Sequence, residues 1–234
     1  MSNSGLYINR DTFFCFTGRH CILLDLLNDK YICTRRELMQ AVGPRLMGWS
    51  TVEDVSGAHA SQPETTEFLN QLLAANLVTD HSDMGREARL PAVSSASYTL
   101  YTRDVCNKWR LPLGAIWSFA RGCRRAHREL TSEPLREVVA RARAQAKTTD
   151  FDLKLLQLAL LQFRTMRYLF PRSYLCLFDA LALLHFLSSY NIRPTWVFGV
   201  SSEPFQAHCW LQLGEVVLND TLERTRAFTP IMAA

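Results

Sequence analysis

The sequence AHCWLQLGEVVLND, residues 207–220, decides how the C-terminal part of the chain folds. Its first seven residues alternate in a pattern typical of a β-strand, and Val216–Asn219 predicts a second strand just after it. Alternation along the first strand places His208, Trp210 and Gln212 on one face and Cys209 on the other. We therefore expect a β-hairpin that presents His208 to a site and buries Cys209 in the core.

The connection between these two strands determines what His208 faces. A two-residue loop at Gly214–Glu215 would pair Cys209 with Asp220 and leave His208 on the opposite face. A three-residue loop, or one bulge, would bring His208 opposite Asp220, with their Cβ atoms about 5 Å apart. We predict the odd-numbered connection.

Cys176 precedes a run in which Leu177, Leu181 and Leu184 repeat at helical spacing, so it should lie in the first turn of a buried helix. There the free backbone amides and the positive end of the helix dipole favour a thiolate, and they can also donate to an oxyanion. A free cysteine taken alone is more often a small buried hydrophobe. The order cysteine, histidine, aspartate on helix, strand and strand instead indicates a nucleophile, a base and a carboxylate that orients the base.

Other polar residues are weaker candidates for the site. His185 lies nine residues along the helix of Cys176, too far to reach its thiol, and Asp179 reads as a charge in the first turn. The remaining histidines have polar or basic neighbours and no evident partner: His20, His59, His81 and His127.

The rest of the chain predicts an α+β fold in two parts. Residues 1–80 should hold a three-stranded sheet (Phe13–Thr17, Cys21–Leu27, Lys30–Cys33), a helix capped by Thr34 and Glu37 that ends at Val42, and a helix over Glu64–Asn76. Residues 81–110 are interpreted as a linker. Residues 111–234 should form helices over Leu113–Leu130, Pro134–Ala146 and Leu153–Leu169, followed by the helix of Cys176 and strands that begin at Thr195–Val200.

Composition narrows the class of protein. The 234 residues carry a net charge of +4, and the excess of Lys and Arg between Arg103 and Lys147 reads as solvated helix faces rather than a nucleic-acid surface. The seven cysteines include no CxxC pair, which argues against a disulfide framework and against a metal site. No secretory signal and no membrane-spanning run is evident, so we expect a cytoplasmic protein with free thiols and no membrane insertion.

Several motifs occur in a familiar order. They are Tyr174–Leu177, Asn191–Pro194, Phe198–Val200, Pro204–Trp210 and Val217–Asp220. Together they resemble the leader peptidase, or B protein, of lasso-peptide biosynthesis, a transglutaminase-like (papain-like) cysteine protease. The segment Cys21–Tyr31 is similar to the strand-turn-strand of that family's precursor-recognition domain, a small winged-helix-like fold, which here would be fused to the protease.

The resemblance implies a function and two partners. The leader of a ribosomally made lasso precursor peptide would add as a strand along Lys30, Tyr31, Ile32 and Cys33 and enter a groove beside Phe68 and Leu72. Cys176 would be the nucleophile, His208 the base and then the acid, and Asp220 the residue that orients His208. The protease would cut between leader and core, freeing the amine that an asparagine-synthetase-like lasso cyclase joins to an acidic side chain.

Some questions stay open at the level of sequence. One oxyanion donor is the amide of Cys176, and Arg172, Ser173 and Tyr174 are candidates for the second. The triad needs no cofactor, but the resemblance implies dependence on ATP. The basic segment Arg121–Arg128 is the one sequence feature that could bind a nucleotide. Two alternatives to leader cleavage remain: acyl transfer to an amine by the same triad, and a non-catalytic scaffold that delivers the precursor to the cyclase.

Overall fold

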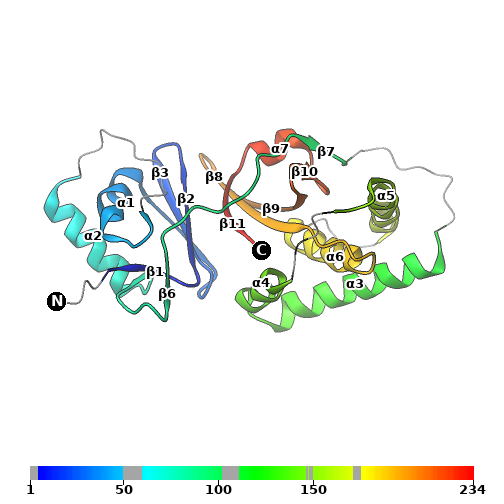
Figure 1. Ribbon diagram of the computed structural model, residues 1–234, viewed down its shortest axis with the longest axis horizontal. Coiled ribbons are helices and arrows are strands. Elements are labelled where there is room, and N and C mark those ends of the chain that lie inside the picture. The colour runs from blue at the N-terminus through cyan, green and yellow to red at the C-terminus, as the bar shows by residue number, and fades with distance from the viewer. Residues whose placement is uncertain (1–4, 50–59, 102–110, 146, 148–149, 171–174) are drawn as a thin grey trace. The chain divides into compact units, whose positions relative to one another are not determined.

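A computed structural model describes residues 5–49, 60–101, 111–145, 147, 150–170 and 175–234 (Figure 1). The chain forms two compact units. The N-terminal unit contains residues 1–92 together with 200–206 and 229–232, and the C-terminal unit contains residues 93–199, 207–228 and 233–234. No helix among the described residues is long and apolar enough to span a membrane.

The N-terminal unit is built on an antiparallel meander of three strands. Strands β2 (Thr12–Thr17), β3 (His20–Asp25) and β4 (Lys30–Arg35) are joined by tight turns and lie in the order β2-β3-β4. The turn into β4 requires Asp29 to adopt a positive φ of 52°, which Asp tolerates better than most residues. A second small sheet has the order β5-β1-β6, formed by Val78–Thr79, Tyr7–Asn9 and Gly85–Arg86.

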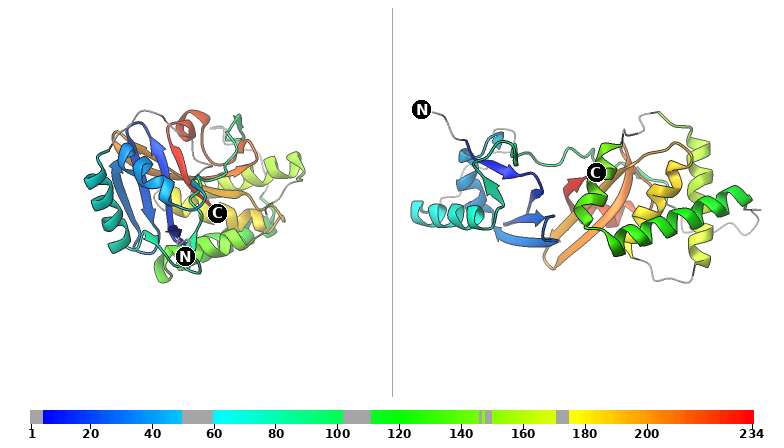
Figure 2. Two further views of the ribbon diagram at one scale, coloured as in Figure 1. Left: turned by 60° about the vertical axis from the view of Figure 1, so that its left-hand side comes forward. Right: turned by 90° about the horizontal axis from the view of Figure 1, so that it is seen from below.

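Two helices pack on one face of the meander (Figure 2, left). They are α1 (Arg36–Val42), followed by the short 3-10 helix η1 (Gly43–Arg45), and α2 (Gln62–Ala74). The capping box that begins α2 joins Ser61 and Glu64. The shared core contains Phe14 and Leu23 from the sheet, Met39 from α1 and Phe68 and Leu72 from α2.

A five-stranded sheet has the order β11-β8-β9-β10-β7, and most of its residues belong to the C-terminal unit. Its strands are β7 (Tyr98–Thr99), β8 (Thr195–Ser202), β9 (Phe205–Leu213), β10 (Val216–Val217) and β11 (Thr229–Ala233). Gly199 of β8 lies beneath the indole of Trp210, where an added Cβ would come within 2.9 Å of the ring. A glycine is therefore required where Trp210 crosses β8.

Helices form the rest of the C-terminal unit. They are α3 (Leu113–Ser132), α4 (Leu135–Ala144), α5 (Leu153–Leu169), α6 (Cys176–Ser188) and α7 (Leu222–Arg226). Most residues of α6 are buried, which its nearly continuous apolar sequence explains. Aromatic contacts between Phe119, Phe163 and Phe186 join α3, α5 and α6. Gly122 allows the close approach of α3 to α6, because a Cβ there would lie 3.1 Å from the carbonyl oxygen of Ala182.

The structure confirms the α+β class and most predicted elements, including both bounds of α5. The predicted N-cap at Thr34 is wrong: Thr34 pairs with Cys21 inside β4, and α1 begins two residues later without a side-chain cap. Part of the predicted linker also has regular structure, because Gly85–Arg86 pairs with β1. The short strands β1, β5, β6 and β7 and the C-terminal elements α7 and β11 were not predicted.

Candidate active site

Cys176 is the first residue of α6, and its side chain is partly buried. The preceding residue, Leu175, is extended and offers no side-chain cap, so its side chain does not accept from the first amides of the helix. Asp179 follows in the first turn, as predicted, and its amide donates to the carbonyl of Leu175 at 2.8 Å. The buried body of α6 therefore fixes the position of the sulfur.

His208 and Asp220 meet at the other side of the same pocket. Nε2 of His208 lies 2.5 Å from Oδ2 of Asp220, and both side chains are buried. Because Nε2 is hydrogen-bonded to the carboxylate, Nδ1 is the ring nitrogen that can exchange a proton with Cys176. The His208 ring also contacts the rings of Trp210 and Phe228, with centroids 6.1 and 5.1 Å away. These contacts limit rotation of the imidazole.

The hairpin brings His208 and Asp220 together through a different connection from the one predicted. Leu213 pairs with Val216, so the connection is the two-residue turn Gly214–Glu215 and the expected odd-numbered loop is wrong. Gly214 has a φ of 54°, which suits such a turn. Strand β10 ends at Val217, but the amide of Leu218 still donates to the carbonyl of Leu211 at 2.9 Å. The amide of Leu211 donates in turn to the side chain of Asn219, whose Oδ1 accepts at 2.8 Å.

Asp220 is held by the elements on both sides of it. Its main-chain oxygen accepts from the hydroxyl of Thr99 in β7 at 2.6 Å. Its Oδ1 accepts from the amide of Thr221, the N-cap residue of α7, at 2.8 Å. Arg224 of α7 lies 3.8 Å from Oδ2. Oδ1 of Asp220 therefore accepts from the backbone, and Oδ2 faces His208.

The electrostatics of the pocket favour a charged pair. Hydrogen bonds from Cys209 and His208 lower the pKa of Cys176 to about 4. Burial acts to lower the pKa of His208, but its hydrogen bonds with Asp220 and Cys176 raise that pKa above the ordinary value. Both directions describe a thiolate beside an imidazolium, the reactive form of a cysteine nucleophile.

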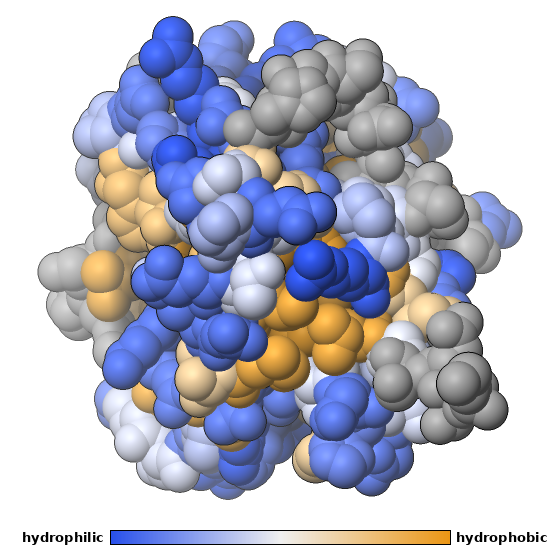
Figure 3. Space-filling model, turned by 90° about the vertical axis from the view of Figure 1, so that its left-hand side faces the viewer, coloured by the Kyte–Doolittle hydropathy of each residue, from blue (hydrophilic) through white to orange (hydrophobic). Residues whose placement is uncertain are grey.

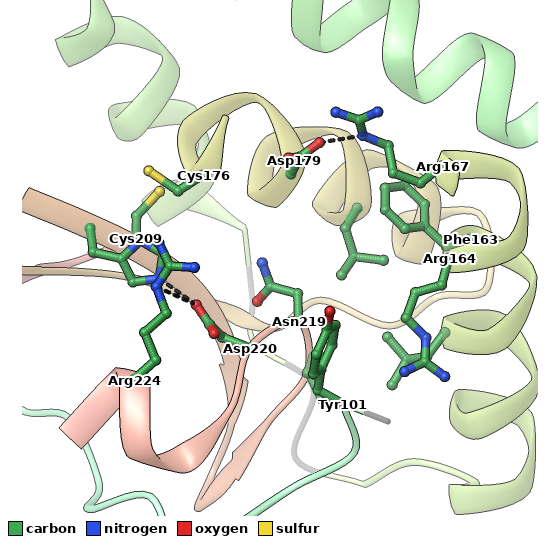
Figure 4. A pocket seen from close by; sticks show the side chains of 14 residues that line it. Tyr101, Phe163, Arg164, Arg167, Cys176, Asp179, Cys209, Asn219, Asp220 and Arg224 are labelled. Carbon is green, nitrogen blue, oxygen red and sulfur yellow. Dashed lines mark hydrogen bonds and ion pairs between the residues drawn. The ribbon is translucent and has the colours of Figure 1, made fainter. Parts of the chain in front are cut away.

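Cys209 is buried, as expected, but it does not lie apart from the site. It lines the same pocket as His208 and Cys176, and its sulfur lies next to that of Cys176 in Figure 4. The hydrogen bond to Cys176 and burial both raise the pKa of Cys209, so this thiol keeps its proton and donates it. Alternation along a strand points His208 and Cys209 in different directions, but it does not prevent both from contacting a third residue. Cys176, at the start of α6, contacts both side chains.

The pocket itself encloses about 380 Å³. Besides Cys176, His208, Cys209 and Asp220, its wall includes residues that were not predicted to belong to the site: Tyr101, Leu160, Phe163, Arg164, Arg167, Asp179, Leu183, Leu218, Asn219 and Arg224. Nε of Arg167 lies 2.5 Å from Asp179, which fixes α5 to the first turn of α6 (Figure 4). The spacing of Arg164 and Arg167 puts both on one face of α5, but no pattern shows which neighbour that face meets.

The other candidates have different surroundings. His185 bonds Glu129 at 2.7 Å, and Arg125 and Arg141 also contact this buried carboxylate, so His185 belongs to an ion network between α3, α4 and α6. The exposed Arg121 and Arg128 lie on α3, and the ATP requirement stays a prediction. Three candidates for the second oxyanion donor, Arg172, Ser173 and Tyr174, lie outside the described residues.

The residues predicted to bind a leader lie in two environments. Lys30, Tyr31, Ile32 and Cys33 belong to β4, an edge of the β2-β3-β4 sheet, and Lys30 and Cys33 are exposed. In contrast, Phe68 and Leu72 are only 9% and 2% exposed and form part of the core. On the face that Figure 3 draws, the largest apolar area lies near the centre, and smaller apolar areas lie toward the left edge, with hydrophilic side chains around them.

Comparison with known proteins identifies the superfamily of the C-terminal part of the chain. The model of the transglutaminase-like superfamily matches residues 109–233, and the chain belongs to that superfamily. Its members are in general cysteine peptidases or transferases, and the matched range contains every residue that lines the pocket except Tyr101. No curated protein and no solved structure matches the chain.

The low pKa of Cys176 leads to a direct test by alkylation. We expect its rate of reaction with iodoacetamide to rise as the pH passes about 4 and to be level above about pH 6, whereas free glutathione titrates near 8.5. Cys209→Ala removes a hydrogen bond to the thiolate and should move the midpoint to higher pH. Peptide mapping after short pulses measures this rate. A midpoint near that of glutathione would contradict the thiolate–imidazolium pair.

Proposed function

We propose that the protein is a cysteine peptidase that binds a lasso precursor peptide through its leader and cleaves the leader from the core. The observation that carries the proposal is the convergence of Cys176, His208 and Asp220 on one pocket with a depressed pKa at the thiol. Three residues with these chemical roles, in this order, are what a covalent peptidase requires. The resemblance of the surrounding motifs to lasso leader peptidases supplies the class of substrate.

The reaction follows from the geometry. The Cys176 thiolate attacks the scissile carbonyl, and the amide of Cys176 at the start of α6 donates to the oxyanion that forms. His208 gives the proton on Nδ1 to the leaving amine, which becomes the N-terminus of the core peptide. The thioester is then hydrolysed by a water molecule that His208 deprotonates, while Asp220 keeps Nε2 occupied throughout. The steps need no cofactor.

Recognition of the leader is assigned to the N-terminal unit, as a winged-helix-like module. An extended peptide can add to the edge strand β4 through main-chain hydrogen bonds, along Lys30–Cys33. Because Phe68 and Leu72 lie on the buried face of α2, they pack this helix into the core, and the peptide would contact more exposed neighbours. The freed amine passes next to a lasso cyclase, so we infer that the two enzymes form a complex.

Two other functions share parts of this structure. Acyl transfer to an amine uses the same thioester, and the superfamily match is compatible with it. A scaffold that delivers the precursor to the cyclase would need the N-terminal unit and no reactive thiol. The depressed pKa of Cys176 favours catalysis over the scaffold, since a scaffold gives no reason for an activated nucleophile.

One experiment separates the three functions. The protein is incubated with a panel of synthetic lasso precursor peptides in water enriched in ¹⁸O, with and without added glycinamide. The masses of the products are then measured by mass spectrometry. Hydrolysis gives a leader fragment with one ¹⁸O in its new carboxylate. Transfer gives a leader–glycinamide adduct without the label and contradicts the peptidase. Binding of a precursor without any fragment supports the scaffold, and failure to bind or cleave any member of the panel would refute the proposal.

A further inference from the structure

Cys209 is a thiol of the active-site pocket that the proposed reaction does not use. It belongs to β9, is only 2% exposed and lines the pocket together with Cys176 and His208. A hydrogen bond joins the two cysteine side chains, and Figure 4 shows their sulfur atoms side by side. Neither cysteine is in a disulfide, and both belong to the C-terminal unit. The pocket therefore holds the nucleophile and a second sulfur in direct contact.

The elements that carry the two cysteines hold the sulfurs in this contact. Cys176 is the first residue of α6, most of which is buried, and β9 lies between β8 and β10 in the five-stranded sheet. Each sulfur therefore depends on a well-packed element and not on a loop. Sulfurs that are already hydrogen-bonded reach the S–S bond length of about 2.05 Å by rotation of the two side chains, without movement of either element.

The cysteines differ in charge and in access, which gives them different roles in an oxidation. Cys176 is partly exposed, and its pKa of about 4 makes it a thiolate at neutral pH. A thiolate that solvent can reach is the form of cysteine that peroxides oxidise. Burial raises the pKa of Cys15 to about 12 and raises that of Cys21 as well, so these core thiols keep their protons. We therefore expect peroxide to attack Cys176 first.

We propose that Cys176 and Cys209 form a site of reversible oxidation, at which hydrogen peroxide converts the nucleophile into a Cys176–Cys209 disulfide and stops catalysis. The Cys176 thiolate attacks one oxygen of the peroxide, the O–O bond breaks, and the hydroxide that leaves takes a proton from the imidazolium of His208 to become water. The sulfur of Cys209 then attacks the sulfenic acid of Cys176. The S–O bond breaks, and the departing hydroxide becomes a second water with the proton that Cys209 releases. Two electrons pass from the two sulfurs to the peroxide, and a reducing dithiol reverses the change.

The charge of Cys176 sets the order of these two steps. Its hydrogen bond is the largest cause that raises the pKa of Cys209, burial is the next, and the negative charge of the thiolate adds to both. A sulfenic acid is neutral, so oxidation of Cys176 removes this charge and makes the proton of Cys209 easier to release. His208, neutral after the first step, lies in the same pocket and can carry that proton to the departing hydroxide.

The test is a map of the cysteines after exposure to excess hydrogen peroxide. Remaining thiols are blocked with N-ethylmaleimide during unfolding, and the protein is digested with chymotrypsin, which cuts after Tyr190 and Trp196, between the two cysteines. We expect a disulfide-linked pair of peptides that carries Cys176 and Cys209 and separates on reduction. In the folded protein, alkylation of Cys176 by iodoacetamide should fall by about tenfold or more after peroxide and recover with dithiothreitol.

Removal of the second sulfur should turn a reversible oxidation into an irreversible one. Cys209→Ser keeps a hydrogen-bond donor beside the thiolate but cannot form a disulfide. Excess peroxide should therefore convert Cys176 to the sulfinic acid, which dithiothreitol does not restore. Dimedone added with the peroxide should capture the sulfenic acid of Cys176 in this variant and far less of it in the unaltered protein. Cys209→Ala should behave in the same way, and rapid labelling of Cys176 before peroxide is added shows that each variant has folded.

The matched control is Cys33→Ser, which removes an exposed thiol from β4. It should form the Cys176–Cys209 disulfide to the same extent as the unaltered protein. Three results would overturn the inference. They are a sulfinic acid at Cys176 of the unaltered protein with Cys209 still reduced, a disulfide that joins Cys176 mainly to another cysteine, and equal recovery with dithiothreitol in the unaltered protein and in both Cys209 variants.

Failure of this inference can be distinguished from failure of the proposed function. The map of the cysteines requires no precursor, so oxidation is measured whether or not a lasso peptide is cleaved. If precursors are cleaved and no Cys176–Cys209 disulfide forms, the peptidase stands and the oxidation site falls. If the disulfide forms and no precursor is cleaved, the oxidation site stands and the substrate class is another one.

Discussion

Replacement of Cys176 by serine should lower the rate of precursor cleavage by a factor of about 10⁴ or more. Serine preserves the shape of the side chain, but its hydroxyl is not ionised by the imidazole near neutral pH, whereas the pKa of the thiol is about 4. The loss therefore reports the chemistry of the nucleophile and not the position of α6. Single-turnover cleavage of the precursor, followed by mass spectrometry, measures it.

Two controls make this result specific. Precursor binding and the midpoint of thermal unfolding should be unchanged in Cys176→Ser, because the variant alters one atom at the surface of a pocket. Cys123→Ala removes another thiol, a buried one in α3, and should retain cleavage. A serine variant that keeps more than about a tenth of the activity would place the nucleophile elsewhere in the chain.

Replacement of Asp220 by asparagine should lower the rate of cleavage by about 10²–10⁴-fold and change its dependence on pH. Burial lowers the pKa of His208, and the hydrogen bond with Asp220 is one of the interactions that raise it. Loss of the carboxylate lets the pKa of His208 fall, so the imidazolium is lost at a lower pH. The upper limb of the pH–rate profile should therefore move toward acid, a shift that general unfolding would not produce.

The matched control for Asp220→Asn is Glu223→Gln. Glu223 is an exposed carboxylate in the first turn of α7, three residues from Asp220, and it does not line the pocket. It should leave both the rate and the profile unchanged. If Asp220→Asn lowers the rate but the upper limb stays where it was, Asp220 positions a loop and does not tune His208.

The sequence predicted the elements whose physical causes are local. The helices of the C-terminal unit follow from apolar repeats, and the placement of Cys176 at the first position of α6 follows from the residues after it. The row of His208, Trp210 and Gln212 on one face of β9 follows from alternation. It is seen in the stacking of His208 on Trp210 and the 3.0 Å hydrogen bond from Trp210 to Gln212.

The features that sequence reasoning missed depend on contacts between distant segments. The path of the chain to Asp220 depends on the side chain of Asn219, which accepts from the amide of Leu211, and on Thr99 from β7, a segment interpreted as linker. No sequence pattern assigns Arg164 and Arg167 to the site, and the packing of α5 against α6 brings them to the pocket. Periodicity shows which face of an element is apolar, but not which partner covers it.

The members of the triad also differ in how firmly the structure holds them. Cys176 is attached to a helix whose other residues are mostly buried, so it can move only if the hydrophobic core moves. Asp220 follows a two-residue strand and depends on a few hydrogen bonds, two of which are only partly buried. Segments of this kind open locally at a smaller cost than the whole unit unfolds. On warming, catalysis should therefore cease because the carboxylate leaves the imidazole, while the nucleophile is still in place.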